Sequence, residues 1–420
     1  MAGATHSSDA GSPPPRAPRL QAFHALRYRD YRLLWFSTLF SSSGQWFQQV
    51  TLGWLAYEMT GSALVLGLVN GLRALPLLLL GPLGGVAADR MDKRVLMVGT
   101  QAFLVVAALA FAALVIFGHV EVWHVLLFSA LTGVGWALNT PVRQTLVSQI
   151  VPREELMHAL ALNAAGFNAT RIAGPALAGV LIATLGPGEN FLVQALAYAA
   201  VAALILPIRL PLAPGGSVAG LGASLVEGVR YVSRHPTLRT QLILVLVPVL
   251  VALPYTALLP VLARDTLGRG AGAYGLMVAA PGAGAVAATL VIASLTRVRR
   301  KGRVLLGAIG VLGAALLLVA VSRWFPVTLL ALALVGAAQM TYTTTNQALM
   351  QLTTPPEYRG RVMGIYMLNQ GLLPLGSVLA GVFTDLTEVH LTLAIMGGGV
   401  AAFAAVAYWR ARSIRELVAT

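Results

Sequence analysis

Apolar residues gather into long stretches along this chain, separated by short segments rich in charge, proline and glycine. A helix needs about 20 apolar residues to cross the roughly 30 Å of hydrocarbon in a bilayer. Stretches of this length recur and predict twelve transmembrane helices, at Leu33–Tyr57, Ala63–Ala87, Val95–Phe117, Val122–Val147, Met157–Leu185, Asn190–Ile208, Leu238–Ala263, Tyr274–Leu295, Val304–Val321, Val327–Leu352, Val362–Phe383 and Thr392–Trp409. An even number of spans places both termini on one side of the membrane.

The segment between the sixth and seventh spans divides the chain into two halves. It contains PLAPGG and then SLVEGVRYVSRH, a pattern that predicts a short amphipathic helix at the membrane surface. We therefore expect a disordered cytoplasmic tail at 1–22, a six-helix bundle at 23–208, a cytoplasmic linker with that helix at 209–237, a second six-helix bundle at 238–410 and a cytoplasmic tail at 411–420. The first tail is rich in proline, serine and alanine and lacks the apolar core of a signal peptide.

The two halves share residues at a nearly constant spacing, which indicates a duplicated unit. Arg27-Tyr28 is matched by Arg230-Tyr231, and Ala178-Gly179-Val180 is matched by Ala380-Gly381-Val382. Pseudo-symmetric halves are what alternating access uses, since each half moves against the other around a site near the bilayer midplane. The expected fold is an all-α membrane protein with two six-helix bundles.

Composition agrees with a membrane protein. Of 420 residues, 57% are hydrophobic and only 10% are charged, and the mean hydropathy is +0.77. A soluble protein of this size needs more charge to cover its surface. The chain has no cysteine, which excludes disulfides, thiolate metal sites and cysteine nucleophiles. The histidines form no metal-binding spacing, and no hydrolase or ATP-binding motif is present, so we expect neither an enzyme nor a cofactor.

The net charge of +14 follows from the position of the basic residues. Most of the 29 lysines and arginines fall on the loops and tails of one side, whereas the opposite side has Arg264, Arg269 and Arg323. This asymmetry predicts an inner-membrane protein with cytoplasmic termini. The basic run RVRRKGR is then a cytoplasmic loop, and we expect no nucleic-acid partner.

Two motifs resemble those of a known family. The run GVAADRMDKR, between spans two and three, resembles the GxxxDRxGRR loop of the major facilitator superfamily, with Asp92 in place of the second glycine. Span five carries NATRIAGPALAG, which is similar to the Gly-Pro motif of antiporters in that superfamily. The motif residues are Gly85, Asp89, Arg90, Lys93 and Arg94 in the loop, and Gly166, Gly174, Pro175 and Gly179 in span five.

Further segments, among them GQWFQ at 44–48 and YRGRV at 358–362, look like the enterobactin-exporter-like branch, and the resemblance covers about residues 23–415. It implies a secondary transporter that exports siderophores, drugs or related amphiphiles in exchange for protons. It also implies that Asp89 and Arg90 form a gating latch; a charged turn that merely obeys the positive-inside rule is the alternative. The glycines and Pro175 imply a bent or closely packed helix, with or without a role in preventing leak.

Two arginines, Arg73 and Arg171, lie near the middle of their spans. A midplane arginine costs about 3 kcal/mol on insertion scales, so it should face the interior and have a partner. Asn70 and Asn168 each precede one of them by three residues and share its helix face. No acidic residue lies deep in a span, so an anionic substrate group is one candidate partner. Carbonyls, water or a distant acid are the others.

Several other polar residues are candidates for the substrate pathway. Ser41, Gln45 and Gln48 form a polar stripe at helical spacing, which predicts a cavity wall, with hydrogen bonding between helices as the alternative. Arg143 is explained either by a substrate role or by pairing with Glu154 or Glu155. The remaining candidates are Asn139, Asn163, Asn346, Asn369 and Tyr255, an aromatic that is equally explained by packing.

The resemblance implies proton coupling, but no acid is embedded in the spans, so uniport and anion exchange stay open. The groups that could titrate are Asp89, Glu58, Asp385 and His158. The expected partners are a small-molecule substrate, protons and the lipid bilayer, and a two-lobe bundle can work as a monomer. An importer, an anion exchanger or a lipid flippase of the same fold is the alternative within transport. A membrane receptor or scaffold is the alternative outside it.

Overall fold

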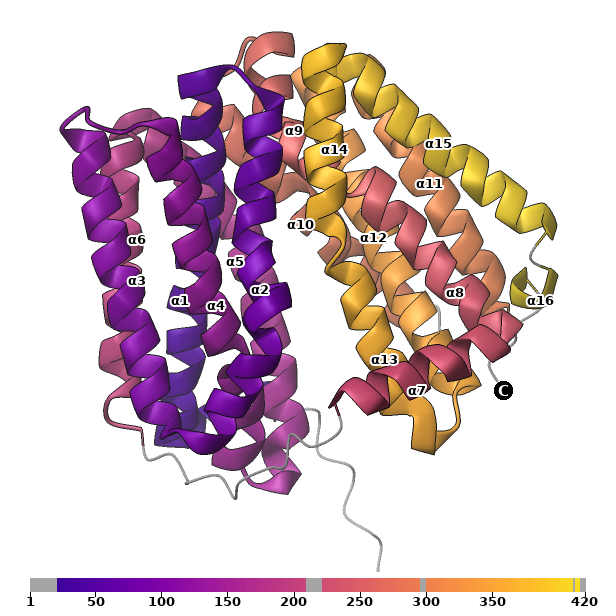
Figure 1. Cartoon of the computed structure of the whole chain (residues 1–420), viewed down its shortest axis with the longest axis horizontal. Coiled ribbons are helices and arrows are strands. Elements are labelled where there is room, and N and C mark those ends of the chain that lie inside the picture. The colour runs from indigo at the N-terminus through magenta and orange to yellow at the C-terminus, as the bar shows by residue number, and fades with distance from the viewer. Residues whose placement is uncertain (1–20, 209–220, 295–299, 411, 416–420) are drawn as a thin grey trace, which may run out of the picture.

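The computed structural model describes residues 21–208, 221–294, 300–410 and 412–415, and these residues form helices and short connections without strands. The first lobe contains six long helices: α1 (Arg29–Thr60), α2 (Ala63–Arg90), α3 (Lys93–Ile116), α4 (Val122–Ile150), α5 (Leu156–Thr184) and α6 (Pro187–Ile205). Short 3₁₀ turns, η1 (Gln21–Arg27) and η2 (Arg153–Glu155), precede α1 and α5. Figure 1 shows these helices side by side in one bundle.

The second lobe also contains six spans, two of which are interrupted. The seventh consists of α8 (Pro236–Val247), the π-helical turn η3 (Pro248–Ala252), α9 (Tyr255–Val261) and the π-helical turn η4 (Leu262–Thr266). Then follow α10 (Ala271–Ser294), α11 (Lys301–Val321), α12 (Phe325–Thr353), the pair α13 (Pro356–Gln370) and α14 (Leu373–Leu386), and α15 (Val389–Arg410). A short α16 (Arg412–Arg415) comes last. The expected fold of twelve spans in two lobes is therefore confirmed over the residues described.

Proline explains the interrupted seventh span. Proline has no backbone N–H to donate within a helix, and its ring crowds the preceding turn. Pro248 begins the first π-helical turn, and Pro254 stands directly before α9. In the eleventh span, Gly371 and Leu372 separate α13 from α14, and Pro374 lies in the first turn of α14.

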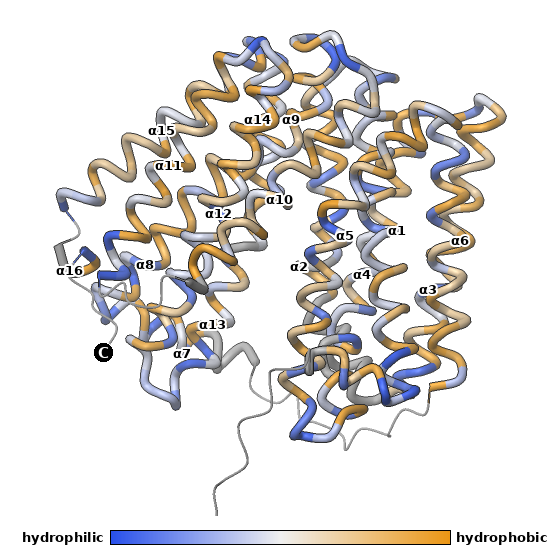
Figure 2. The backbone as a smooth tube through the Cα atoms, turned by 180° about the vertical axis from the view of Figure 1, so that it is seen from behind, coloured by the Kyte–Doolittle hydropathy of each residue, from blue (hydrophilic) through white to orange (hydrophobic). Residues whose placement is uncertain are grey.

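Nine spans in the described part of the chain are apolar enough by length and composition alone to cross a membrane. Of the remaining three, α1 and α5 carry polar residues that the sequence predicted to face the interior, such as Gln45, Gln48 and Arg171, and α2 has a shorter apolar stretch, Ala63–Pro76, in its described part. Figure 2 shows the hydrophilic residues mainly at the two ends of the bundle, with apolar helix segments between them. This distribution matches a bilayer around the middle of the molecule.

Two helix pairs join the lobes, α2 with α14 and α5 with α10. A Cβ atom on Gly67 of α2 would lie 2.6 Å from the carbonyl oxygen of Ser377, and one on Gly179 of α5 would lie 2.7 Å from the carbonyl oxygen of Ala271. Only glycine permits backbones to approach this closely. Gly179 of the Gly-Pro motif thus lies in the contact between lobes.

The other residues of the Gly-Pro motif pack against α1 on one side of α5 and against α10 on the other. Gly166 and Gly174 pack against Trp35 and Trp46 of α1, within the first lobe. Pro175 is buried inside α5, and its carbonyl oxygen lies 2.5 Å from where a Cβ on Gly275 of α10 would stand. The motif therefore serves close packing on two sides of α5.

The lobes meet at one end of the molecule and diverge toward the other (Figure 1). We call the diverging end, where α1 begins and α15 ends, the terminal face, and the opposite end the far face. Helix α7 (Leu221–Arg234) lies on the terminal face against α13. There Tyr231 stacks on Tyr358 with ring centroids 4.0 Å apart, and Glu227 pairs with Arg361 at 2.9 Å. Of the expected tail at 1–22 and the expected linker at 209–237, residues 1–20 and 209–220 lie outside the described residues, and α7 is the helix predicted in the linker.

Candidate functional site

The loop between α2 and α3 contains the first motif that the sequence analysis singled out. The side chains of Gly85, Asp89 and Arg90 lie outside the described residues, so the predicted latch stays a prediction. Asp92, which replaces a glycine of the motif, caps α3: its Oδ1 accepts hydrogen bonds from the backbone N–H groups of Arg94 at 2.7 Å and Val95 at 3.3 Å. An N-cap aspartate satisfies backbone donors that the helix leaves free.

The two basic residues that end this motif behave differently. Lys93 is buried, and its Nζ donates to Oε1 of Gln149 on α4 at 2.9 Å. Arg94 is exposed. Lys93 therefore ties the start of α3 to the end of α4.

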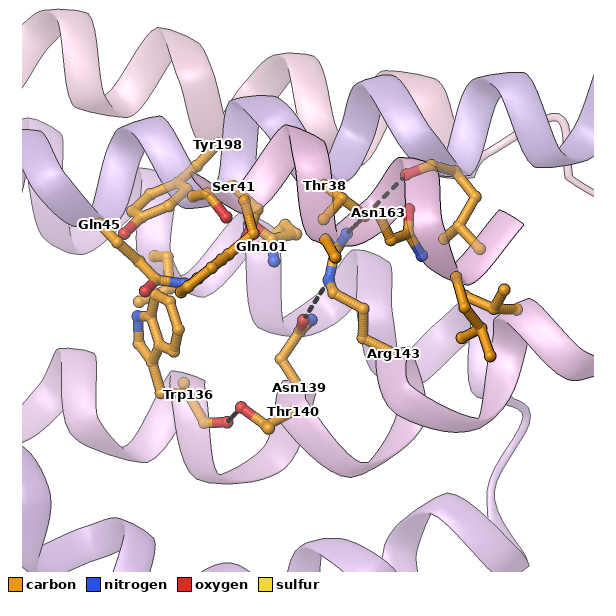
Figure 3. A pocket seen from close by; sticks show the side chains of 18 residues that line it. Thr38, Ser41, Gln45, Gln101, Trp136, Asn139, Thr140, Arg143, Asn163 and Tyr198 are labelled. Atoms are coloured by element: carbon orange, nitrogen blue, oxygen red, sulfur yellow. Dashed lines mark hydrogen bonds between the residues drawn. The ribbon is translucent and has the colours of Figure 1, made fainter. Parts of the chain in front are cut away.

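The first lobe contains a cavity of about 430 Å³. Its walls come from α1, α3, α4, α5 and α6. It lies toward the terminal face, because the α1 residues that line it run from Leu34 near the start of that helix to Gln45 at its middle. Figure 3 shows ten of the lining side chains: Thr38, Ser41, Gln45, Gln101, Trp136, Asn139, Thr140, Arg143, Asn163 and Tyr198. A volume of this size suits a small organic molecule.

Arg143 is the one charged side chain among the described residues that line this cavity. Its Nε donates to Oδ1 of Asn139 at 3.3 Å, and its Nη1 donates to the hydroxyls of Ser37 at 3.2 Å and Thr38 at 3.0 Å. Its Nη2 is buried and has no hydrogen-bond partner among the described residues. All of these partners are neutral, so the positive charge of Arg143 has no carboxylate beside it in the described structure.

The sequence left open an ion pair of Arg143 with Glu154 or Glu155, but in the structure Arg143 pairs with neither. Glu155 instead accepts hydrogen bonds from His158 at 3.0 Å and from His24 at 3.1 Å. Its carboxylate therefore connects η1 to the start of α5. Arg143 lines the cavity without an acidic partner in the described structure.

Four neutral amides, Gln45, Gln101, Asn139 and Asn163, belong to the polar part of the cavity. Asn139 is oriented by a second hydrogen bond, from its Nδ2 to Oγ1 of Thr100 at 3.0 Å, which turns its oxygen toward Arg143. Gln101 is 1% exposed, and its Oε1 has no hydrogen-bond partner among the described residues. Two residues that line the cavity, Arg143 and Gln101, thus each have one buried polar atom without such a partner.

The aromatic walls of the cavity are the part that sequence reasoning missed. Trp136, Phe167 and Tyr198 line it together with aliphatic side chains such as Leu34 and Leu104. Trp136 lies on the same face of α4 as Asn139 and Arg143, at helical spacing, and this signal could have identified it. No pattern in the sequence distinguishes Phe167 or Tyr198 from aromatic residues that pack between helices.

The polar stripe of α1 divides between two environments. Ser41 and Gln45 line the cavity. Gln48 is 2% exposed and hydrogen-bonds within the lobe: its Nε2 donates to Oγ1 of Thr132 at 2.6 Å, and its Oε1 accepts from Gln194 at 3.2 Å. For Gln48 the structure therefore favours the alternative of hydrogen bonding between helices, although it also borders a small space between the lobes.

Arg73 and Asn70 lie at the contact between the lobes. They line a space of about 20 Å³, enough for about one water, whose other walls include Gln49 of α1 and Tyr274 of α10. Nη1 of Arg73 donates to Oε1 of Gln49 at 3.3 Å, and Nδ2 of Asn70 donates to the carbonyl of Leu66 in its own helix. Arg73 therefore faces the interior of the molecule with an amide as its partner.

Arg171 also lies where the two lobes meet. Its Cγ is 3.3 Å from where a Cβ on Gly282 of α10 would stand, and it interacts electrostatically with Tyr255 of α9. Among the described residues its guanidinium has no hydrogen-bond or ion-pair partner. Asn168 bonds the carbonyl of Ala164 in its own helix.

Of the other candidates, Asn163 lines the cavity in the first lobe and accepts a hydrogen bond from Tyr31 at 3.4 Å, whereas Tyr255, Asn346 and Asn369 do not line it. Tyr255 and Asn346 are packed in the second lobe, with 1% and 0% exposure. Asn369 is 8% exposed and donates to the carbonyl of Leu242 at 2.9 Å. Within the described residues, no group of three or more His, Asp or Glu is placed to hold a metal ion.

Comparison with known proteins identifies the family. A family model described as a transmembrane secretion effector matches residues 20–418. The Staphyloferrin A transporter of Staphylococcus aureus is 28% identical over 90% of this chain and 96% of its own length. The multidrug efflux pump Tap of Mycolicibacterium fortuitum is 29% identical over 92% of this chain and 96% of its own.

Solved structures show the same fold. The nucleoside transporter NupG has a TM-score of 0.72 at 12% identity and covers 91% of this chain and 99% of its own. An inward-facing, unoccupied bacterial homologue of the human lysosomal transporter Spinster has a TM-score of 0.70 at 14% identity and covers 92% and 98%. The resemblance drawn from the sequence motifs is confirmed: the chain belongs to the transmembrane secretion effector family and is a membrane transporter of the major facilitator superfamily, not an enzyme.

Proposed function

We propose that this protein is a secondary transporter that exports a small amphiphilic anion across the inner membrane. The cavity of about 430 Å³ in the first lobe is its binding site. The observation that carries this proposal is the buried cation of Arg143, which has only neutral partners and a buried Nη2 without one.

A ligand anion is the partner that this arrangement favours. An arginine inside the bilayer costs about 3 kcal/mol even on permissive scales, and proteins normally offset the cost with an acid or with water. A carboxylate or phosphate matches the planar guanidinium and forms strong charge-assisted hydrogen bonds. The unpaired Oε1 of Gln101 favours a hydrogen-bond donor elsewhere on the ligand.

The aromatic walls favour an amphiphilic ligand over a fully polar one. Trp136, Phe167 and Tyr198 present apolar faces to the cavity, and Leu34 and Leu104 add aliphatic surface. Ligand sites of this kind bury the apolar body of the molecule and fix its orientation with a few polar groups. The named relatives support this class, since one is a transporter of the siderophore staphyloferrin A and others are drug efflux pumps.

Orientation and coupling complete the proposal. The positive-inside rule, applied to the loops, places the terminal face and both termini in the cytoplasm. The cavity then lies toward the cytoplasm, as loading of an exported substrate requires. We propose exchange against protons, with Asp89 and Arg90 as the cytoplasmic gating latch and a monomer as the working unit. The efflux pumps among the relatives support export.

The proposal is tested by flux into proteoliposomes, with and without a pH gradient. The panel contains carboxylate siderophores, other organic anions, cationic drugs and neutral amphiphiles. Arg143→Gln removes one charge-assisted contact, worth about 1.5–3 kcal/mol, so anion flux should fall by about tenfold to a hundredfold. Neutral amphiphiles should change by less than about twofold, because they do not depend on that charge.

The matched control is Arg269→Gln. Arg269 is an exposed arginine on the far face that stacks over Phe325 at 5.7 Å, away from the cavity. This control should transport like the original protein. Equal loss of anionic and neutral flux in Arg143→Gln would contradict a role in anion recognition, and flux that ignores the pH gradient would contradict proton exchange.

A further inference from the structure

The far face has a contact between the lobes that involves the first turn of α2. Helix α1 ends at Thr60 and α2 begins at Ala63, so only Gly61 and Ser62 connect them. Gly61 has a positive φ of 61°, which allows this tight turn. The first backbone N–H groups of a helix have no partner within it, so those of α2 need one from outside.

Asp385, near the end of α14 in the second lobe, supplies that partner. Its Oδ1 accepts a hydrogen bond from the N–H of Ala63 at 2.7 Å, and its Oδ2 accepts one from the N–H of Leu64 at 3.1 Å. Oδ2 also accepts from the hydroxyl of Ser62 at 2.5 Å. Ser62 itself caps the N–H of Val65 at 3.3 Å. The capping of α2 is therefore shared between its own lobe and the other one.

The backbones of the two helices are close enough to fix this geometry. A Cβ on Gly381, one turn before Asp385, would lie 2.4 Å from the carbonyl oxygen of Ala63. Beside this contact, Tyr57 of α1 donates a hydrogen bond to Asp265 of η4, which also joins the two lobes. The lobes are thus held together on the far face by two carboxylates of the second lobe that accept from donors of the first.

Asp385 is exposed and borders a cavity of about 570 Å³ on the far face, so water and protons reach it. The other charged and titratable groups that line this space are Tyr57, Asp265, Arg323, Glu388 and His390, and Arg264 interacts electrostatically with Tyr57. Arg323 donates to Nε2 of His390 at 2.5 Å rather than to Asp385. Within the described residues no cation forms an ion pair with Asp385, so the positive end of α2 is its counter-charge.

We propose that Asp385 is a latch that closes the far face. While the lobes meet there, its carboxylate completes the first turn of α2, and opening of the far face removes that cap and leaves two backbone donors without a protein partner. Asp385 acts as a positioning residue, since it touches no substrate. The proposal rests on alternating movement of the two lobes and not on the identity of the substrate.

Distances between spin labels test this latch. The chain has no cysteine, so labels can be placed without removing any. One pair, His119→Cys with Trp324→Cys, spans the far face between two exposed loop residues of different lobes. A second pair, Arg153→Cys with Glu357→Cys, spans the terminal face in the same way. All measurements are made without substrate, so their outcome is independent of what the protein transports.

Asp385→Ala should widen the far-face distance, narrow the terminal-face distance and raise the far-open population about fivefold, the usual effect of a lost N-cap. Asp385→Asn keeps the shape without the charge and should produce a smaller change in the same direction. Glu388→Gln is the matched control, because Glu388 borders the same cavity and its carboxylate forms no hydrogen bond with the other lobe in the described structure. It should leave both distances unchanged.

A pH profile separates a charged latch from simple packing. In the original protein, lowering the pH from about 7 to about 3, through the range in which aspartate carboxylates take up protons, should widen the far-face distance. This response should be reduced in Asp385→Asn, in which Asp265 still joins the lobes, and should be complete in Glu388→Gln and His390→Gln. The proposal is overturned if Asp385→Asn keeps the full acid response, or if Asp385→Ala folds and leaves both distances unchanged. If Asp385→Ala does not fold, the proposal is tested by comparing the acid response of the original protein with that of Asp385→Asn.

Discussion

At the scale of single residues, the arginines inside the bundle show how the environment decides what a charge can do. Arg73 has an amide partner in a space that holds about one water. Arg143 lines a cavity that is large enough for a small organic molecule, and its hydroxyl and amide partners in the described structure carry no compensating charge. The arginine side chain thus has a neutral partner in a nearly closed space at Arg73, whereas at Arg143 it borders a cavity that we propose a ligand occupies.

Glu155 provides a test outside the membrane. Hydrogen bonds from His158 and His24 hold the pKa of the Glu155 carboxyl below its ordinary value. Because the pKa is lowered, the ionised carboxylate stabilises the folded contact at pH values above the ordinary pKa of a glutamate. This stabilisation is lost as the pH falls through the lowered pKa of Glu155. We expect a spin label at Phe23→Cys on η1 to be immobile at neutral pH and to become mobile in acid.

Glu155→Gln is the control for this measurement. Without the carboxylate, η1 should be mobile over the whole pH range. A label that is equally immobile in Glu155→Gln at neutral pH would show that the apolar contacts of η1 hold it without Glu155.

Several site residues could be predicted from the sequence because lipid tolerates so few polar groups. Gln45, Asn139, Arg143 and Asn163 were selected on that ground, and they lie around one cavity. Gln48 met the same criterion but faces other helices, because a sequence gives the face of a helix and not its neighbours. The capping role of Asp385 could not be predicted from the sequence, because its hydrogen-bond partners are 321 to 323 residues away along the chain.

At the scale of elements, close helix crossings determine how the lobes meet. In α5, Gly179 lies against the backbone of α10, and in α2, Gly67 lies against that of α14. The sequence analysis assigned Gly179 to a motif but left open whether the motif only bends the helix. Its contact partner belongs to the other lobe, so the answer depended on tertiary structure.

Gly179→Ala tests this crossing. The added methyl would stand 2.7 Å from the carbonyl oxygen of Ala271, so the two helices must separate. We expect about 1–3 kcal/mol of destabilisation, as for other overpacked contacts, seen as a lower melting temperature of the purified protein and a wider far-face distance. Gly307→Ala is the matched control, since Gly307 of α11 has nothing within 4 Å of the added atom. Equal behaviour of the two variants would contradict the role of this crossing.

The interrupted spans were less accessible to prediction than the continuous ones. The stretches around Pro248 and Gly371 are long and apolar enough to predict single helices, and each is built from two helices. Proline is tolerated in membrane helices when the surroundings satisfy the freed carbonyls. Whether it bends, widens or breaks a helix depends on those surroundings.

At the scale of the whole molecule, the hydropathy pattern and the repeat were sufficient to predict two lobes of six spans. They contained no information on which ends of the lobes touch. The structure places the contacts of α2 with α14 and of α5 with α10 between the lobes, and the lobes diverge toward the terminal face (Figure 1). The cavity of the first lobe lies toward that face.

The most direct test of the central claim is the reactivity of one cysteine inside the cavity. Ala164 lines it and is exposed, so Ala164→Cys can be labelled in a chain that has no other cysteine. A membrane-impermeant maleimide should react faster from the terminal face, in inside-out vesicles, than from the far face, and a transported anion should slow that reaction. Labelling that is equally fast from both faces, or that a transported anion leaves unchanged, would contradict the account.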